Sequence, residues 1–319
     1  MENVTLHGIK SKACPKWEVP PEELGSRAGQ HGARDYARYE RYERESPSLD
    51  SETHDAAHGR YTNETHAIKR GQNVFQGLVR VSTPDLHKPD MLHTRYLGRF
   101  KHMIDWIQGF LKKHARQPAF DDGWQALPPY PGFFVPKKAY KEVTQWQGQE
   151  MRNLGRCLLG VLGVALRQPD STQVQPFRCA LTCVRSLLDF TMVAQYRSHT
   201  PETISYMEKY ATQFDETKDI FLEFGISKRT QEKADVLRKE LRRQRAQMRE
   251  RVPASQRRRI CDDDREEEND QSKELIYSES NFNFVKMHLI GHFRDHIYMF
   301  GNIPMYSTEY GELAHKEQI

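Results

Sequence analysis

The amino-acid sequence predicts an α/β fold interrupted by a large, mainly α-helical insertion. A short run of β-forming residues at 73–82 indicates a strand or tight hairpin. Apolar residues then recur at helical spacing between 92 and 224, and a packable pattern resumes at 282–290. With 319 residues, the chain is long enough for one large domain or two ordinary ones.

The first half of the predicted core follows a polar N-terminal segment. We expect residues 1–70 to be partly disordered, because 26–70 are rich in charged, Ser and Gly residues and hold almost no aliphatic ones. Residues 71–112 supply the strand and one amphipathic helix over 92–111. Asp90 therefore stands where a loop enters a helix.

Residues 113–270 form the predicted insertion. Its proline- and aromatic-rich beginning, 118–136, is interpreted as an irregular connector. Three helices should follow, with Thr200 as the cap of the last, over residues 140–167, 177–196 and 201–224. Residues 271–319 then return to the core.

Composition and charge limit the classes to which the protein can belong. The mean hydropathy of −0.83 indicates much exposed surface, and the net charge of +4 is too mild to identify a partner. The N-terminus lacks a secretory pattern, and no apolar run reaches the roughly 20 residues of a membrane span. An odd set of cysteines favours reduced thiols inside the cell; they are Cys14, Cys157, Cys179, Cys183 and Cys261.

Two acidic motifs lie near opposite ends of the chain. Asp90 is followed three positions later by His93, and Glu312 three positions later by His315. Carboxylates that converge on two Mg²⁺ ions, about 4 Å apart, can activate an attacking oxygen and stabilise a leaving one. Taken singly, an Asp such as Asp90 is more often a helix cap, and a Glu such as Glu312 is more often a solvated helix residue. The prediction of a metal site therefore depends on the two motifs occurring together.

The chain resembles fungal transposases of the Plavaka group, relatives of the CACTA elements. The segments that carry this resemblance are 13–16, 84–93, 144–146, 282–288 and 306–316. The resemblance implies a ribonuclease H-like core split by a helical insertion, with DNA as the partner and Mg²⁺ or Mn²⁺ as the cofactor.

The resemblance also implies roles for individual residues. Asp90 is similar to the second catalytic Asp, His93 to the His that follows it, and Glu312 to the closing Glu, with Glu309 as the competing choice. Such enzymes carry a first catalytic Asp upstream of the region that matches Cys14, and here the chain starts only a few residues before it. We therefore interpret the chain as an incomplete copy with little or no strand-cleavage activity.

A zinc site is expected to be vestigial. Relatives tend to have a Cys-x-x-Cys pair where this chain has Cys14 followed by Trp17. Cys14 with His54 and His58 would supply at most three of the four ligands that structural zinc generally takes, so bound zinc is not expected. A lone, partly buried cysteine is almost as good an interpretation.

Repeated histidines are interpreted as residues for packing or for contacts near the acidic site, and the paired cysteines as packing residues. His288, His292 and His296 recur at helical spacing, but the first pair lacks the Glu of a zinc protease. Cys179 and Cys183 lie one turn apart in an apolar helix and are expected to be buried thiols.

The candidate DNA-binding residues lie mainly in a basic stretch over 228–259: Arg242, Arg243, Arg245, Arg249, Arg257, Arg258 and Arg259. The stretch also permits nuclear import. Alternatively, it is a solvated helix paired with the acidic run 262–268. Trp146 could stack on an extruded base, although core packing is the stronger interpretation, as it is for Trp106.

The sequence therefore predicts a nuclear, transposase-derived DNA-binding protein without membrane or small-molecule partners. A non-catalytic DNA-binding or protein-interaction module is the alternative, and a fragment that does not fold stably is a third. Self-association is left open.

Overall fold

A computed structural model describes residues 14–20, 23–25, 31–34, 88, 90–128, 130–131, 148–225, 235–236, 239–240, 243 and 282–308, with only the helical backbone of 92, 93, 95, 97, 148, 149 and 225. This part is mainly helical. Its β structure is limited to isolated bridges such as Trp17 with Ala33. The described residues therefore display no ribonuclease H-like sheet, and the strand expected at 73–82 lies outside them.

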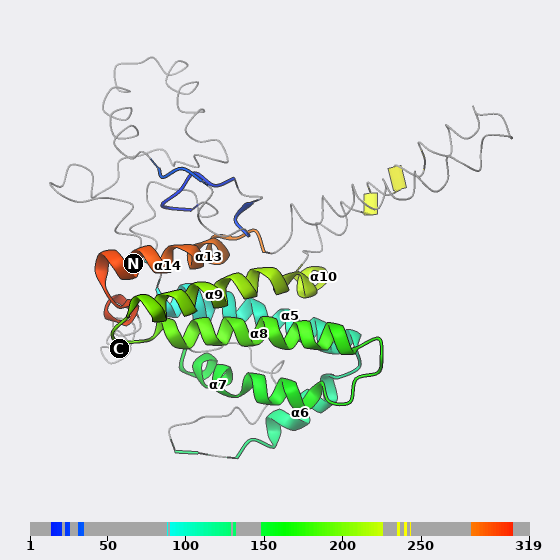
Figure 1. Ribbon diagram of the computed structural model, residues 1–319. Coiled ribbons are helices and arrows are strands. Elements are labelled where there is room, and N and C mark those ends of the chain that lie inside the picture. Colours follow the sequence, from blue (N-terminus) through cyan, green and yellow to red (C-terminus); the bar gives the residue numbers. More distant parts are fainter. Residues whose placement is uncertain are drawn as a thin grey trace, which may run out of the picture.

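The helical elements follow one another in two blocks (Figure 1). The first block comprises η4 (Met91–Phe100), α5 (Lys101–Lys113), α6 (Gln117–Gln125), α7 (Gly148–Ala165), α8 (Val174–Ala194), α9 (Pro201–Thr217), η6 (Lys218–Phe221) and α10 (Leu222–Gly225). The second comprises α13 (Val285–His288), η8 (Leu289–His292), α14 (Phe293–Phe300) and η9 (Ile303–Tyr306).

The helix predicted at 92–111 is confirmed, with an unexpected first half. Its first ten residues, η4, form a π-helix. This form is rare in proteins, and where it occurs it often lies at a functional site. It continues directly into α5, where Met103, Ile107 and Phe110 are fully or almost fully buried on one face. That spacing of three to four residues is what places them on the same side of the helix.

Helix α6 corrects the expectation of an irregular connector at 118–136. Pro118 lies in its first turn, where a missing backbone N–H is tolerated. Phe120 and Trp124 follow one turn apart, and both are buried. The proline signal that suggested a loop marks the start of this helix instead.

The helices predicted in the insertion are confirmed in the described residues. Helix α7 covers most of 140–167, α8 most of 177–196, and 201–224 is divided among α9, η6 and α10. Thr200 caps α9 as expected: its side chain accepts from the Thr203 amide, while the Thr203 hydroxyl accepts from the Thr200 amide.

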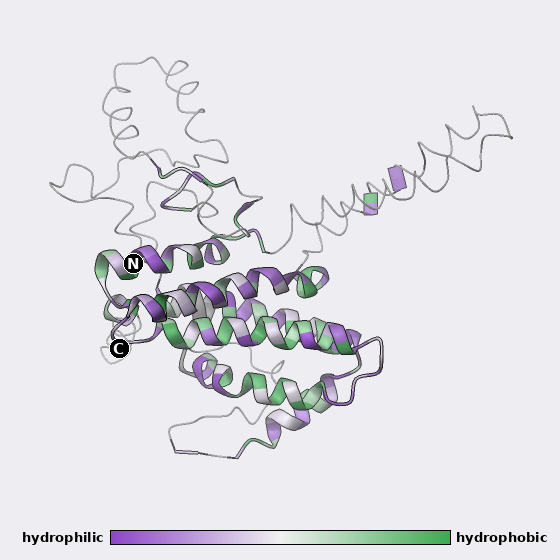
Figure 2. Cartoon of the chain, in the orientation of Figure 1, coloured by the Kyte–Doolittle hydropathy of each residue, from purple (hydrophilic) through white to green (hydrophobic). Residues whose placement is uncertain are grey.

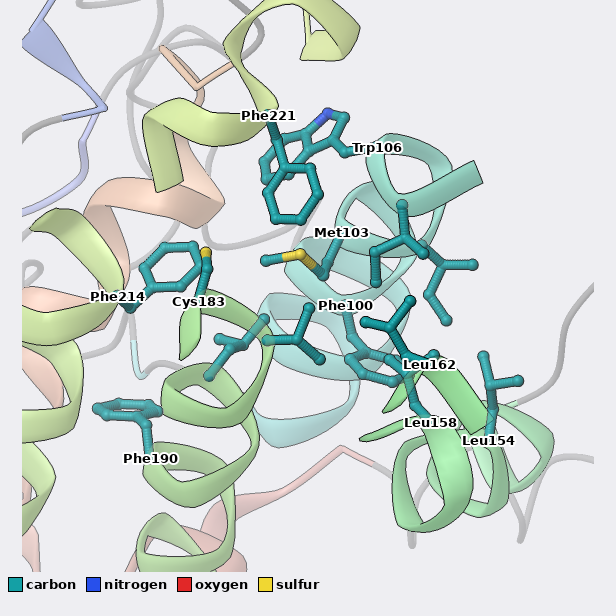
Figure 3. Close-up of a cluster of buried hydrophobic side chains, with 14 of the residues drawn as sticks. Phe100, Met103, Trp106, Leu154, Leu158, Leu162, Cys183, Phe190, Phe214 and Phe221 are labelled. Carbon is teal, nitrogen blue, oxygen red and sulfur yellow. The ribbon is translucent and has the colours of Figure 1, made fainter. Parts of the chain in front are cut away.

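One hydrophobic core joins these helices. Helices α8 and α9 lie side by side, and α7 packs on η4 and α8 (Figure 1). Hydrophobic residues run along α7 and α8, whereas α9 is more hydrophilic (Figure 2). Side chains from η4, α5, α7, α8 and α9 meet in Figure 3, among them Phe100, Trp106, Leu158, Cys183 and Phe214.

The C-terminal elements belong to the same core. Met287, Ile290, Phe293, Ile297 and Ile303 pack into it. No helix in the described part of the chain is long and apolar enough to span a membrane.

Candidate functional site: an acidic junction and a Cys-His-His centre

Asp90 meets the C-terminal motif segment. The Thr308 amide donates to one Asp90 carboxylate oxygen at 3.0 Å, and the Thr308 hydroxyl donates to the other at 2.8 Å. Asp90 is buried at the entrance to η4, although 218 residues separate it from Thr308. The fold therefore brings together the two segments that the sequence singled out.

This junction positions only part of the predicted acidic set. Asp90 is described in full, whereas His93 is placed only as a backbone position in η4. Thr308 directly precedes Glu309, but Glu309, Glu312 and His315 lie outside the described residues. The carboxylate that would pair with Asp90 stays a prediction.

The Asp90 carboxylate is compatible with a hard cation. An ionised carboxylate has about four lone-pair positions, so the two bonds from Thr308 do not by themselves exclude a metal ion. Mg²⁺ prefers such oxygen ligands. The alternative that Asp90 is structural gains equal support, because both of its oxygens already tie Thr308 to the start of η4.

A second cluster forms around Cys14. Its ligand atoms and those of His288 and His292 all lie within 4.8 Å of one another, and the three residues are buried. The Cys14 Sγ lies 3.3 Å from the His292 Nε2. Thiolate sulfur and imidazole nitrogen are the ligands that zinc takes in proteins.

The local structure explains why these side chains converge. His288 ends α13 and His292 ends η8, so residues four apart share one helical face. The amides of Lys16 and Trp17 both donate to the Cys14 Sγ at 3.4 Å. The turn after Cys14 is thereby wrapped around the sulfur, as it would be around a thiolate.

Further contacts hold the N-terminal segment, whose described residues are 14–20, 23–25 and 31–34, against the C-terminal helices (blue and orange in Figure 1). The Gly25 amide donates to the Asn283 side-chain oxygen at 2.9 Å. Val285 packs on the small cluster of Cys14, Val19 and Leu24. The centre thus lies at a packed junction between distant parts of the chain.

The electrostatics of the centre favour neutral groups without a metal. Burial raises the pKa of the Cys14 thiol, although the amides of Lys16 and Trp17 oppose this shift. Burial, together with the nearby His288, holds the pKa of His292 well below its usual range. Metal binding at neutral pH would therefore take a neutral imidazole and release the thiol proton.

Trp17 stands beside the cluster where the sequence suggested a lost cysteine. Its ring centre lies 4.8 Å from that of His292 and 6.1 Å from that of His288. The described residues therefore supply three protein ligands, the number that leaves one position open on zinc.

This geometry revises the expectations for the histidines. His288 and His292 lie beside Cys14, in a group of side chains that could hold a metal ion. His296 packs against Phe300, with ring centres 5.4 Å apart. His54 and His58, the partners suggested from sequence, lie outside the described residues. The helical spacing of the histidines was visible in the sequence, but their meeting with Cys14 was not.

The other residues singled out from the sequence lie in the core, at the surface or outside the described part of the chain. Trp106 and Cys183 are core residues, as expected, and the half-buried Cys179 contacts the Thr217 carbonyl at 3.7 Å. Arg243 is an exposed helical residue. Outside the described residues lie Trp146, Arg242, Arg245, Arg249, Arg257, Arg258 and Arg259.

Comparison with known proteins supports part of the resemblance. Residues 1–107 match the family described as Plavaka transposase. No curated protein and no solved structure matches the chain. The matched range includes both Cys14 and Asp90 and ends within α5.

Proposed function

We propose, on the premise that residues 1–107 form a Plavaka transposase family domain, that this chain is a transposase-derived DNA-binding protein. Its ancestral activity is metal-dependent cleavage and transfer of DNA strands, within a ribonuclease H-like core. The observation that carries the proposal is the pair of hydrogen bonds from Thr308 to Asp90, because Thr308 directly precedes Glu309 and lies 218 positions from Asp90.

Asp90 and Glu312, with Glu309 as the alternative, would hold the Mg²⁺ or Mn²⁺ of such a site. The metal would supply an activated attacking oxygen and charge stabilisation for phosphodiester chemistry. His93, three positions after Asp90, would belong to the same catalytic site. An intact set has three carboxylates, of which we identify two, so we expect little or no strand cleavage by this chain alone.

DNA contact is assigned to the basic stretch over 228–259, and to Trp146 as a stacking residue. Each Lys or Arg that neutralises a phosphate releases counterions, which makes binding fall steeply with salt. Arg243, an exposed helical residue, belongs to this stretch. A protein of this kind acts in the nucleus, which the same basic residues permit.

The Cys14, His288 and His292 cluster would hold zinc through three protein ligands, and its place in the fold favours a positioning role. His292 directly precedes α14, and the chain then passes through η9 to Thr308. Arg99 of η4 also donates to the carbonyls of Lys286 and Met287, just before His288. A metal at this junction would therefore help to position the segment that meets Asp90.

The decisive experiment compares DNA binding and plasmid nicking for the wild type, Asp90→Asn and Asp105→Asn. Asp105 is an exposed acidic residue of α5 and serves as the control. Salt-dependent DNA binding is expected for all three. Nicking that requires Mn²⁺ and disappears only in Asp90→Asn would establish an active enzyme, whereas absence of DNA binding by the folded protein would refute the proposal.

A non-catalytic DNA-binding or interaction module is the second candidate. It is favoured by the burial of Asp90 and by the use of both its carboxylate oxygens in holding Thr308. Binding that persists in Asp90→Asn and Glu312→Ala, without nicking by any form, would support this module.

A further inference from the structure

A cavity of about 450 Å³ opens between η4, α7 and the end of α8. Its inner wall is formed in part by the buried rings of Tyr96 and Phe100. Two exposed residues, Met192 and Tyr196, also line it and are 58% and 46% exposed respectively. The cavity volume lies within the range of small-ligand sites.

The charged side chains of this cavity are all positive. Arg152 and Arg156 of α7 line it, and none of the described residues that line it is acidic. The Arg152 guanidinium lies 5.4 Å from the centre of the Tyr96 ring. Arg156 is exposed. The site therefore combines aromatic surface with groups that attract a phosphate.

An amide group completes the inner side. The Tyr96 hydroxyl donates to the Gln195 side-chain oxygen at 3.2 Å, and the Gln195 amide nitrogen donates to the Thr191 carbonyl at 3.1 Å. Gln195 is thus held in a fixed orientation at the cavity. An oriented amide of this kind can recognise the polar edge of a planar ring.

The cavity lies close to the acidic junction. Tyr96 follows Asp90 by six positions along η4, which is no more than roughly 9 Å at a helical rise of about 1.5 Å per residue. The Asn302 side chain donates to the Arg197 carbonyl at 2.7 Å, which ties the chain just after α8 to the segment that leads to Thr308. The cavity and the acidic junction are therefore linked both through η4 and through the contact between Asn302 and Arg197.

We propose that this cavity binds one unpaired nucleotide of a DNA strand held at Asp90, an inference that rests on the proposed function. The base stacks on Tyr196 against Met192, and the adjoining phosphate lies between Arg152 and Arg156. Every base has a flat face for such stacking, so the site selects unpaired nucleotides with little sequence preference.

The test uses two DNA duplexes that differ by a single unpaired 2-aminopurine. Fluorescence anisotropy gives the Kd for each duplex, and 2-aminopurine emission reports stacking on the protein. We expect the wild type to bind the bulged duplex at least roughly fivefold more tightly and to quench its emission, in keeping with the strength of base–aromatic stacking. Tyr196→Ala should reduce that preference, and Arg156→Gln should weaken binding of the bulged duplex more than binding of the plain duplex.

Matched controls separate stacking from surface charge and hydrophobicity. Tyr206 is also 46% exposed but lies on α9, and Arg178 is an exposed residue near the start of α8. Neither Tyr206→Ala nor Arg178→Gln should change the preference. Equal binding of the two duplexes by the wild type would overturn this inference alone, whereas binding of neither duplex would overturn the proposed function as well.

Discussion

Thr308 donates its backbone amide and its hydroxyl to the two carboxylate oxygens of Asp90, so one residue engages both ends of a buried carboxylate. Hydrogen bonds to a charged acceptor are stronger than those between neutral groups. The arrangement joins the entrance of η4 to the end of the described chain. Whatever chemistry occurs at Asp90, this pair sets its position.

The Thr308 hydroxyl should contribute measurably to stability. Thr308→Val removes one donor from a buried carboxylate, and we expect it to lower the free energy of unfolding by about 1–2 kcal/mol in urea titrations. The control is Thr172→Val, because the Thr172 hydroxyl donates to Asp170 at 2.6 Å in an exposed setting. That change should cost less than about 0.5 kcal/mol. Equal effects of the two substitutions would show that the hydrogen bond from Thr308 to Asp90 contributes no more to stability than an exposed one.

Cys14 should determine zinc content. The wild type purified with zinc is expected to retain the metal, and Cys14→Ser to lose it, as measured by elemental analysis. Free zinc at about 100 times the Kd would stabilise the wild type by about 2.7 kcal/mol, which a chelator should remove. Cys157→Ser, at a half-buried cysteine outside the cluster, should leave both properties unchanged. Zinc content that is the same in both variants would exclude the centre.

Trp17→Cys should strengthen the centre. Trp17 lies beside His292 and His288, and a thiolate at this position would add a fourth ligand to the three described ones. We expect zinc affinity to rise at least about tenfold, which corresponds to about 1.4 kcal/mol. Competition with a chromogenic chelator measures this change. Trp17→Phe controls for the loss of the indole, and an equal affinity in both variants would contradict the prediction.

Gly25 should be required for docking of the N-terminal segment. A Cβ at this position would lie 2.7 Å from the Asn283 side-chain oxygen and 3.1 Å from the Phe282 carbonyl, which is backbone and cannot easily move. Gly25→Ala is therefore expected to weaken zinc binding and to increase amide exchange around α13, with α7–α9 unaffected. Gly32→Ala is the control, because a Cβ there has no atom within 4 Å. Comparable exchange in the two variants would argue against docking through Gly25.

His102 should make stability fall in mild acid. Burial, and then the positive charges of Lys286 and Lys101, lower the pKa of His102 from its ordinary value of 6.5. As the pH falls through that value, His102 becomes protonated in the unfolded chain while it stays neutral in the folded chain. The free energy of unfolding therefore decreases. His102→Gln should flatten this dependence between about pH 7 and pH 5. Urea titrations across this range test it, and an unchanged slope in the variant would refute the assignment.

The helices and their buried faces followed from the sequence because helical periodicity is a local property. Residues three and four positions apart share a face whatever the rest of the chain does, so α5, α8 and the Thr200 cap could be predicted directly. Helix α6 was missed because its proline is compatible with both a loop and a first helical turn.

The two candidate sites depend on contacts that no local pattern specifies. Asp90 and Cys14 were recognisable as chemically capable residues, and the histidines of α13 and η8 as sharing one face. Their partners lie 218 residues away in one case and 278 in the other, and only packing of the intervening helices brings them together. The sequence by itself determined which side chains could act and which helices carry them. The tertiary structure decided that Thr308 holds Asp90 and that His292 meets Cys14, because burial of the shared core fixes how those helices are arranged.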